Sequence, residues 1–444
     1  MPNKTHPGSF TVHARILGCL LIAMLAACSS QPEISRDTRF TLAVIPDTQN
    51  YLDYTHQKNE GFALDASDLF IAQMRDIASR DEVVFVAAVG DVWQHGTKEI
   101  DEAHAARGVG AIENPIFASA LAPSEKTLTV ELPKALEGYR LLHEAGIPFG
   151  VAPGNHDYDA LWSVEGYPPR LDKNPAELSR TPEDLGILHV GGLDNFRSVF
   201  GDDSEFFQDQ PWYVSSFRGG ANAAQVFAAG GYRFLHITLE MAADDAALSW
   251  AANVIEQHAG YPTIITTHDY LNTGGERRAN PLVDLNRADP LHHNSAEEVW
   301  EKLVSAYDQI FMVLCGHHHG QNLRVDLNHY DHKVYQVLAD YQGRGQAGID
   351  AGAPVNTRRG TPTGLGDGWY RLMHFDLGGE APSIRVETWS SHYRLHAHQL
   401  DQYADWYRDY EQPGATDAEF LAMDEFTLQL DDFRERFGPP GGGR

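Results

Sequence analysis

The sequence predicts an α/β fold, because short strand-like runs alternate with helical segments along most of its 444 residues. Six apolar runs are too short for ordinary helices and too continuously apolar for strands with one wet face, so we interpret them as buried strands. They cover residues 40–45, 83–89, 147–151, 232–239, 263–267 and 310–314. With 42% hydrophobic and 22% charged residues, the composition is globular and excludes a collagen, a coiled coil or a multi-span membrane protein.

Helices are predicted between these runs. Apolar residues recur at helical spacing in residues 69–77 and 134–145. Two further helix starts are predicted from capping patterns, one at Asp244 and one where Ser295 is followed by Glu298. The alternation indicates a sheet covered by helices.

Three parts of the chain depart from this alternation. Residues 96–131 and 161–192 are long loops with Pro and Gly, which is typical of functional or partly disordered segments. Residues 432–444, which end in GPPGGGR, are expected to be a disordered tail. After Gly316 the strand signals become shorter, and we expect a second, more antiparallel sheet from residues 323–327, 333–338, 369–375 and 383–388.

The first 27 residues are expected to be a bacterial lipoprotein signal peptide. Two basic residues precede an apolar run that is too short to span a bilayer, and the run ends in Leu-Ala-Ala-Cys, which resembles a lipobox. Cys28 would carry the lipid, residues 28–39 would form a tether, and residues 40–431 would fold. We therefore expect an extracytoplasmic protein anchored to a bacterial membrane, at the periplasmic face or the cell surface, with a plain secretory signal as the alternative.

The charge balance bears on the partners of the protein. Acidic residues outnumber basic ones by 62 to 34, which gives a formal net charge of −28. A surface of this sign repels nucleic-acid backbones, so no nucleic-acid binding is expected. A small phosphate substrate stays compatible with this charge if bound cations reverse its sign in one cleft. Of the three cysteines, only Cys315 would remain an ordinary thiol, and we expect it to be buried packing.

Side chains able to ligate metals follow five of the predicted strands. They are Asp47, Asp91, Asn155, His268 and His317, with His156, Asp157, His318 and His319 beside them. Loops at the carboxyl ends of strands in an open α/β sheet gather at one edge, so we expect these residues to lie together. Each alone has an ordinary explanation as a turn, a helix cap or a polar surface residue, but the set favours a metal site. Such ligands suit divalent ions such as Mn, Fe, Zn, Mg or Ca, and the lack of thiolates argues against structural zinc.

The order and spacing of these residues resemble a known family. The motif blocks of the calcineurin-like dinuclear metallophosphoesterases are similar to Asp47-x-Gln49, Gly90-Asp91, Gly154-Asn155-His156-Asp157, His268 and Gly316-His317-x-His319. The resemblance extends over about residues 40–320, and PDTQ combined with a later ADYQ at 339–342 is similar to a secreted or surface branch. It implies a four-layer sandwich of two mixed β-sheets flanked by helices.

By this resemblance, two sets of residues would each hold one divalent metal ion: Asp47, Gln49, Asp91 and His319 the first, and Asp91, Asn155, His268 and His317 the second. A hydroxide bridging the two ions would attack phosphorus. His156 would protonate the leaving oxygen, and Asp157 would orient its ring. Gln49 stands where the family usually has His, which leaves the metals open among Mn, Fe, Zn and Mg, and Gln94 stands where Asp or Asn is usual.

The resemblance implies a metallophosphoesterase that hydrolyses small phosphate mono- or diesters. Substrate contacts are expected from residues that can stack on a base or sugar, or grip a phosphate, namely Tyr51, Trp93, Tyr158, His318 and Arg344. Two alternatives stay open. A protein phosphatase needs an open groove, which the two long loops would cover, and a non-catalytic surface lipoprotein would carry a vestigial metal site.

Overall fold

The computed structural model describes residues 37–52, 64–118, 122–174, 177–353 and 364–441. The predicted signal peptide and Cys28 lie outside these residues. Within the described part of the chain, no helix combines the length and apolar character needed to cross a bilayer. The described residues all belong to one unit, Pro32–Arg444.

The first large sheet is mixed and has seven strands. Its spatial order is β16 (Leu395–His396), β15 (Ser383–Ser390), β14 (Trp369–Asp376), β1 (Arg39–Ile45), β2 (Val83–Ala88) and β4 (Phe149–Val151), and β17 (Phe426–Gln429) also pairs with β15. Strands β1, β2 and β4 run parallel, and β14 runs antiparallel to β1 with Ala43 opposite Leu372.

The second large sheet is also mixed and has seven strands. Its order is β12 (Gly320–Leu327), β13 (Lys333–Asp340), β11 (Ile310–Cys315), β10 (Thr263–Thr266), β9 (Tyr232–Thr238), β8 (Asn222–Ala229) and β7 (Tyr213–Phe217). The four strands β9, β10, β11 and β13 are parallel, and antiparallel strands flank them on both sides.

All six predicted buried strands are confirmed, but their grouping differs from the prediction. The expected antiparallel sheet of residues 323–388 does not form, since β12 and β13 extend the second sheet whereas β14 and β15 join β1 in the first. The apolar pattern of a strand reports that both of its faces are covered. It carries no information about which distant strand becomes the neighbour, and that explains the error.

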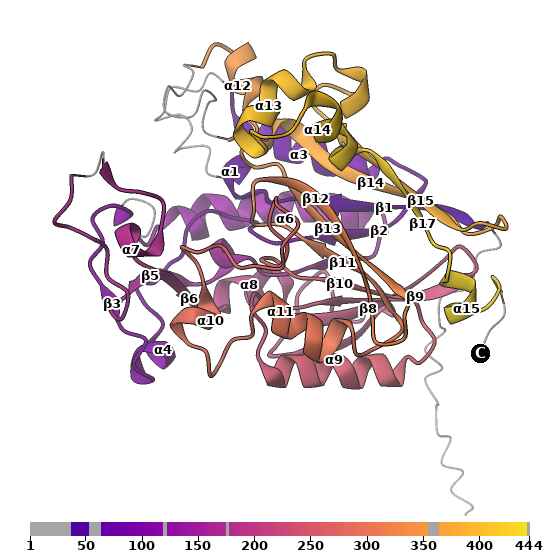
Figure 1. Ribbon diagram of the computed structural model, residues 1–444, viewed down its shortest axis with the longest axis horizontal. Helices are drawn as coiled ribbons and strands as arrows, with labels where there is room; N and C mark the ends of the chain where they lie inside the picture. The colour runs from indigo at the N-terminus through magenta and orange to yellow at the C-terminus, as the bar shows by residue number, and fades with distance from the viewer. Residues whose placement is uncertain (1–36, 53–63, 119–121, 175–176, 354–363, 442–444) are drawn as a thin grey trace, which may run out of the picture. The chain divides into compact units, whose positions relative to one another are not determined.

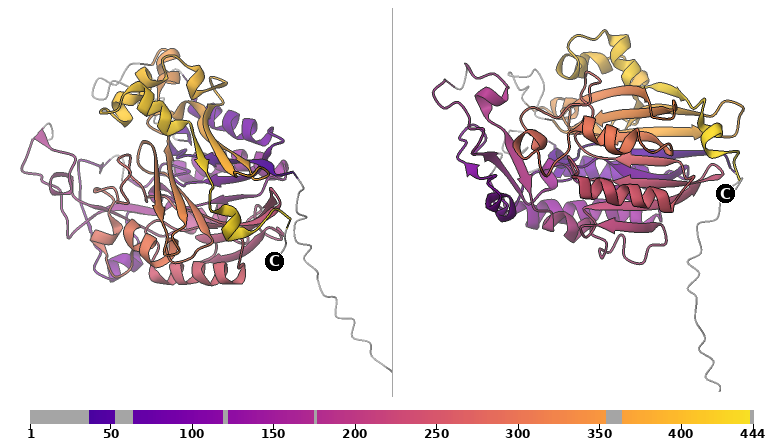
Figure 2. Two further views of the ribbon diagram at one scale, coloured as in Figure 1. Left: turned by 45° about the vertical axis from the view of Figure 1, so that its right-hand side comes forward. Right: turned by 60° about the horizontal axis from the view of Figure 1, so that its bottom comes forward.

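The core lies between the two sheets and between each sheet and its helices (Figures 1 and 2). Along β1, Leu42 and Val44 pack toward the second sheet, whereas Ala43 and Ile45 pack toward helices α3 (Ala66–Ala78) and α6 (Leu132–Glu144). Helix α9 (Asp245–Gln257) covers the outer face of the second sheet, together with α11 (Ala296–Val299) and the π-helical turn Trp300–Val304. The structure therefore has two large mixed sheets with helices packed on them.

The predicted helix caps are confirmed. Asp244 accepts a hydrogen bond from the backbone N–H of Ala247 at the start of α9. Ser295 and Glu298 form a reciprocal capping box at the start of α11. Among the remaining short helices are α1 (Gln49–Leu52), α8 (Asp194–Phe200), α10 (Leu285–Ala288) and α12 (Gln346–Asp350).

The two long loops contain structure that the sequence did not predict. A third, three-stranded sheet is formed by β3 (Ala111–Ile112), β5 (Ala160–Val164) and β6 (Leu188–Gly191), accompanied by α4 (Glu102–Ala106) and α7 (Pro182–Leu185). Figure 1 shows these elements together at one side of the large sheets. Their strands are too short to give an alternating pattern, which explains why they were missed.

The expected disordered tail of residues 432–444 is wrong for its described part. After α13 (Tyr403–Glu411), α14 (Asp417–Asp424) and β17, a helix α15 (Phe433–Phe437) packs on the core. The Phe433 ring is buried, and Tyr232 donates its hydroxyl hydrogen bond to the Gly438 carbonyl at 2.8 Å. The buried Phe433 ring, the Tyr232 hydrogen bond and the bonds from Arg436 to the Lys333 and Ile310 carbonyls hold the described part of this segment despite its composition.

Candidate metal centre

The predicted ligands stand in loops at the carboxyl ends of strands, and two sheets supply them. Asp47, Asp91 and Asn155 follow β1, β2 and β4 of the first sheet. His268 and His317 follow β10 and β11 of the second. The site therefore lies where the ends of the parallel strands of both sheets meet.

These side chains converge on the Nε2 atom of His268. This atom lies 3.2 Å from Asp91 Oδ1, 3.2 Å from His317 Nδ1, 3.3 Å from Asn155 Oδ1 and 3.9 Å from Asp47 Oδ2. Asp91, His268 and His317 each offer one ligand atom, and the three atoms lie within 4.8 Å of one another. All five side chains are buried, so the convergence is not a chance meeting of mobile surface groups.

Two of the candidate ligand residues adopt strained backbone conformations. Asp91 has φ +52° and His317 has φ +70°, a region that residues other than glycine rarely enter. Their glycine neighbours across the site permit the close approach. A Cβ on Gly154 would lie 2.2 Å from Asp91 Oδ1, and one on Gly316 would lie 2.2 Å from Asp47 Oδ1. Gly154 and Gly316, two of the three glycines of the predicted motif blocks, are therefore required by the packing of carboxylates against backbone.

The ring of His268 is oriented by the Val89 carbonyl. Its Nδ1 lies 2.9 Å from that oxygen, and a carbonyl only accepts, so Nδ1 carries the proton and Nε2 faces the carboxylates. Burial disfavours the charged ring, but Asp91 and Asp47 hold the pKa of His268 well above its ordinary value. The same two carboxylates would be satisfied by a divalent cation.

The charges of the other ligands follow from burial and neighbours. Burial opposes ionisation of Asp91, yet His268 and His156 hold its pKa below the ordinary value. Burial and then Asp340 raise the pKa of Asp47 well above its ordinary value. Burial lowers the pKa of His317 to about 3, so its ring is neutral, as a metal ligand must be.

The residues present fit a divalent metal ion. Oε1 of Gln49 is buried and has no hydrogen-bond partner among the described residues, while its Nε2 donates to Asp91 Oδ2 at 3.0 Å and to Gln342 Oε1 at 2.6 Å. A buried amide oxygen left unpaired costs free energy that a cation would offset. The surrounding donors are carboxylate, amide and imidazole groups, which suit divalent ions of the Mn, Fe, Zn and Mg type.

His319 occupies a different environment from the central cluster. Its Nδ1 lies 2.5 Å from the hydroxyl of Tyr410 on α13. The role of His319 as a ligand of a first metal ion stays a prediction.

The structure corrects the expected partner of His156. Its Nδ1 lies 2.7 Å from the backbone carbonyl of Gln94, and its backbone N–H donates to Asp91 Oδ1 at 2.8 Å. Asp157 instead accepts from the N–H groups of Val92 and Gly154, each at 2.8 Å. Asp157 therefore stabilises the loops after β2 and β4, because its carboxylate accepts hydrogen bonds from backbone N–H groups of both. The ring of His156 is oriented by the Gln94 carbonyl instead.

Most of the expected substrate contacts are not at the site surface. Trp93 is fully buried and stacks on Phe200, and the Tyr51 hydroxyl accepts from the Gly368 N–H at 2.8 Å. Arg344 is also fully buried, with Nε and Nη2 bound to Glu411 at 2.8 and 2.9 Å. These three predictions were wrong, since the sequence did not reveal the partners that bury the side chains.

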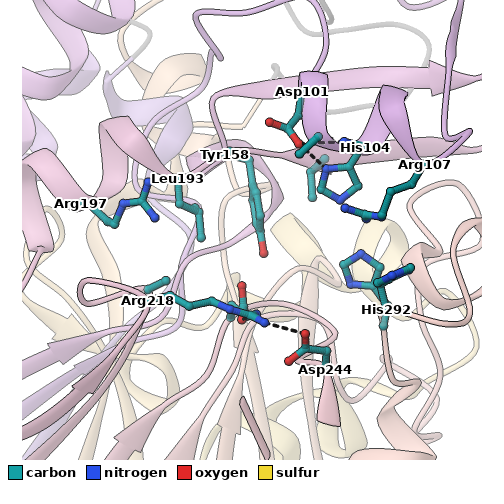
Figure 3. A pocket seen from close by; sticks show the side chains of 15 residues that line it. Asp101, His104, Arg107, Tyr158, Leu193, Arg197, Arg218, Asp244 and His292 are labelled. Carbon is teal, nitrogen blue, oxygen red and sulfur yellow. Dashed lines mark hydrogen bonds and ion pairs between the residues drawn. The ribbon is translucent and has the colours of Figure 1, made fainter. Parts of the chain in front are cut away.

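The other two expected substrate contacts, His318 and Tyr158, lie in different surroundings. His318 is partly buried, and its Nε2 lies 2.9 Å from Asp269 Oδ1, beside His317. Tyr158 lines a cavity of about 420 Å³ that also involves Asp101 and His104 (Figure 3). A substrate contact by His318 stays a prediction.

Sequence reasoning missed three residues that support the cluster. Asp269 lies 3.8 Å from His317 Nε2, Gln342 joins Gln49 to Asp47, and Tyr410 holds His319. Asp269 directly follows His268 and Gln342 ends the ADYQ segment, so their positions gave a signal. Tyr410 lies 91 residues from its partner and gave none.

Comparison with known proteins assigns no function. No family model matches the chain. The chain is 23% identical over 300 residues to the "Uncharacterized protein YvnB" of Bacillus subtilis (strain 168); the match covers 66% of this chain but only 17% of that protein, about a sixth of its length. A solved structure entitled "GAP50 the anchor in the inner membrane complex of Plasmodium" matches with 10% identity and a TM-score of 0.32, over 80% of this chain and 86% of that one.

Proposed function

We propose that the protein is a metal-dependent hydrolase of small phosphate mono- or diesters, built on a four-layer metallophosphoesterase sandwich. The observation that carries this proposal is the convergence of Asp91, Asn155, His268 and His317 from strand ends of two different sheets. A structural role alone gives no reason to bury these polar groups together with two strained backbones.

Two divalent metal ions are proposed as cofactors. Asp91, Asn155, His268 and His317 would hold one, and Asp47, Gln49, Asp91 and His319 the other. The ions would supply an activated water as nucleophile and neutralise charge that develops on the phosphate oxygens. Gln342 would keep Asp47 and Gln49 in place, because its amide bonds to both side chains.

His156 is proposed to donate a proton to the leaving oxygen. Its Nδ1 is committed to the Gln94 carbonyl, which leaves Nε2 as the nitrogen that can exchange a proton with substrate. The ring is partly exposed, unlike the buried ligands beside it. A general acid at this position would release the alcohol product as a neutral molecule.

The proposal also covers the place of action. The predicted lipoprotein signal would put the enzyme outside the cytoplasm on a lipid anchor at Cys28. The acidic chain, with a net charge of −28, disfavours long nucleic-acid substrates and leaves small phosphate esters as the class that locally bound cations can attract.

The test is metal-dependent turnover. Purified protein would be stripped with a chelator, supplied with Mn, Zn, Mg or Fe, and assayed on a nitrophenyl monoester and a bis-nitrophenyl diester. We expect turnover that Asn155→Ala abolishes, that His156→Ala reduces, and that His258→Ala, at the end of α9, leaves unchanged. Failure of every metal to bind would refute the proposal, and two bound metals without turnover on either ester would favour the vestigial-site alternative.

A further inference from the structure

A second group of metal-ligating side chains lies apart from the centre described above. His104 on α4, His189 on β6, His293 and Asp289 each offer one ligand atom, and these four atoms lie within 4.8 Å of one another. His104 and His189 come from the two long loops, and the other two come from the segment after α10. The group therefore joins three separate parts of the chain.

Hydrogen bonds fix the orientation of all three rings. Nδ1 of His189 lies 2.8 Å from the Val190 carbonyl, and Nδ1 of His293 lies 3.3 Å from the Ala242 carbonyl. Because carbonyls only accept, both Nδ1 atoms carry the proton and both Nε2 atoms keep their lone pairs. Nδ1 of His104 lies 2.5 Å from Asp101 Oδ2, the carboxylate–histidine arrangement typical of metal-bound imidazole.

The free nitrogen atoms are buried and unsatisfied. Nε2 of His189 and Nε2 of His293 have no hydrogen-bond partner within the described structure, and His189 is fully buried. The ring centroid of His189 lies 4.9 Å from that of His104 and 5.1 Å from that of His293. Burial lowers the pKa of His189 to about 3 and that of His293 to about 4, so both rings are neutral and available as ligands.

Asp289 completes the group with a negative charge. Its two oxygens lie 2.7 Å from Arg107 Nη2 and 2.8 Å from His292 Nδ1. Burial opposes ionisation, but Arg107 and His292 lower the pKa of Asp289 to about 2. A carboxylate has about four acceptor positions, so these two bonds leave room for a cation.

We propose that His104, His189, His293 and Asp289 form a mononuclear zinc site, distinct from the dinuclear centre and independent of the hydrolase proposal. Three imidazoles and one carboxylate are a tetrahedral ligand set suited to Zn²⁺. Zinc–ligand bonds of about 2.0 Å place tetrahedral ligands about 3.3 Å apart, so binding would draw the four atoms inward. With four protein ligands the ion would keep no open position for a substrate. Although the set lacks the thiolates common in structural zinc sites, the ion would pin the three-stranded sheet to the segment after α10.

The location explains what the site would stabilise. His104 and His293 line the cavity of about 420 Å³, which Figure 3 shows with Arg107, Arg197 and Arg218 around it. Since α4 has only five residues and none is buried, little apolar packing holds it against this wall. A metal bond from His104 would replace that missing packing.

Cobalt substitution and zinc counting on the full chain would test the proposal. Tetrahedral Co²⁺ gives visible absorption bands that higher coordination numbers give only weakly. In His189→Gln and in His293→Gln we expect these bands to disappear and the zinc content to fall by one ion per chain. In Asp91→Asn, which alters the other centre, we expect both the bands and this zinc ion to be kept. His258→Gln serves as the matched control.

A more conservative variant keeps the test valid if the histidine variants misfold. Asp101→Asn keeps the cap of α4 but weakens the hold on His104 Nδ1, and we expect zinc affinity to fall by about 10–100-fold. Far-UV circular dichroism would verify that each variant is folded. Unchanged zinc content in folded His189→Gln, or loss of all zinc in folded Asp91→Asn, would overturn the proposal.

Discussion

Gln342, which follows a strand of the second sheet, forms hydrogen bonds with both Asp47 and Gln49 of the first. Its Oε1 lies 2.6 Å from Gln49 Nε2, and its own Nε2 donates to Asp47 Oδ2 at 3.1 Å. Asp47 and Gln49 follow β1 in the first sheet, whereas Gln342 follows β13 in the second. One amide therefore sets the position of two proposed ligands of the first metal ion.

Gln342→Ala should weaken the first metal ion selectively. Loss of a residue that orients metal ligands typically costs about 10–100-fold in affinity. Isothermal titration of stripped protein should show one weakened site, with the other sites unaffected. Gln346→Ala, which removes an exposed bond to Asp350, is the control, and an equal loss at both sites would contradict the assignment.

His156→Ala should reduce turnover most for substrates with poor leaving groups. Removing a general acid costs about 10²–10⁴-fold, and nitrophenolate leaves more easily without a proton than an alkoxide does. Values of kcat on a nitrophenyl ester and an alkyl phosphate would be compared at full metal occupancy. A loss of the same size on both substrates would argue against proton donation by His156.

Asp157→Ala should destabilise the fold. Its carboxylate accepts from the N–H groups of Val92 and Gly154, and each buried N–H left unpaired costs about 1–3 kcal/mol. The free energy of unfolding should fall by about 2–6 kcal/mol, measured as a lower urea midpoint with an unchanged slope. Asp157→Asn should cost less, because the amide oxygen can still accept. Equal stability of the alanine variant and the parent would show that water replaces the carboxylate.

Arg344 should behave as a structural residue. Arg344→Met leaves Glu411 buried without its cation, which typically costs about 3–5 kcal/mol. The double variant Arg344→Met/Glu411→Leu should recover part of this stability, because neither charge is then stranded. Thermal unfolding of both variants would measure the difference. A double variant less stable than the single one would contradict the argument.

Stability should fall as the pH falls below the ordinary range of histidine, and His236 should contribute. In the folded protein its Nδ1 is hydrogen-bonded to Gln225 and its Nε2 to Thr266. Burial lowers the pKa of His236 to about 3. Between that value and an unfolded-state pKa of about 6.5, only the unfolded chain takes up the proton, so the free energy of unfolding decreases by about 1.4 kcal/mol per pH unit. Urea unfolding of stripped protein at several pH values should show a shallower dependence for His236→Gln. An identical slope would exclude the contribution.

The sequence predicted what local patterns encode. The strands that carry Asp47, Asp91, His268 and His317 were found because both of their faces are apolar, and the turn after each strand supplied the ligand. The convergence of these residues followed from the rule that parallel strands end at one edge, although two sheets share the site.

Long-range packing could not be predicted in this way. Arg344 is neutralised by Glu411, 67 residues further along the chain, so its sequence neighbours gave no sign of burial. Trp93 likewise stacks on Phe200, and its position two residues after Asp91 suggested a substrate contact. The three-stranded sheet escaped prediction because β3 has two residues and β6 has four.

The packing between the two sheets links substitutions in the core to the geometry of the candidate metal site. The rings of Phe85 on β2 and Phe227 on β8 stack with centroids 4.4 Å apart, inside the layer that joins the sheets. Asp91 follows β2, and His268 follows a strand of the sheet that contains β8. The spacing of the two sheets, and with it the separation of these two proposed ligands, thus depends on the thickness of an aromatic layer. Altering the volume of that layer would therefore shift these two proposed ligands relative to each other without replacing either of them.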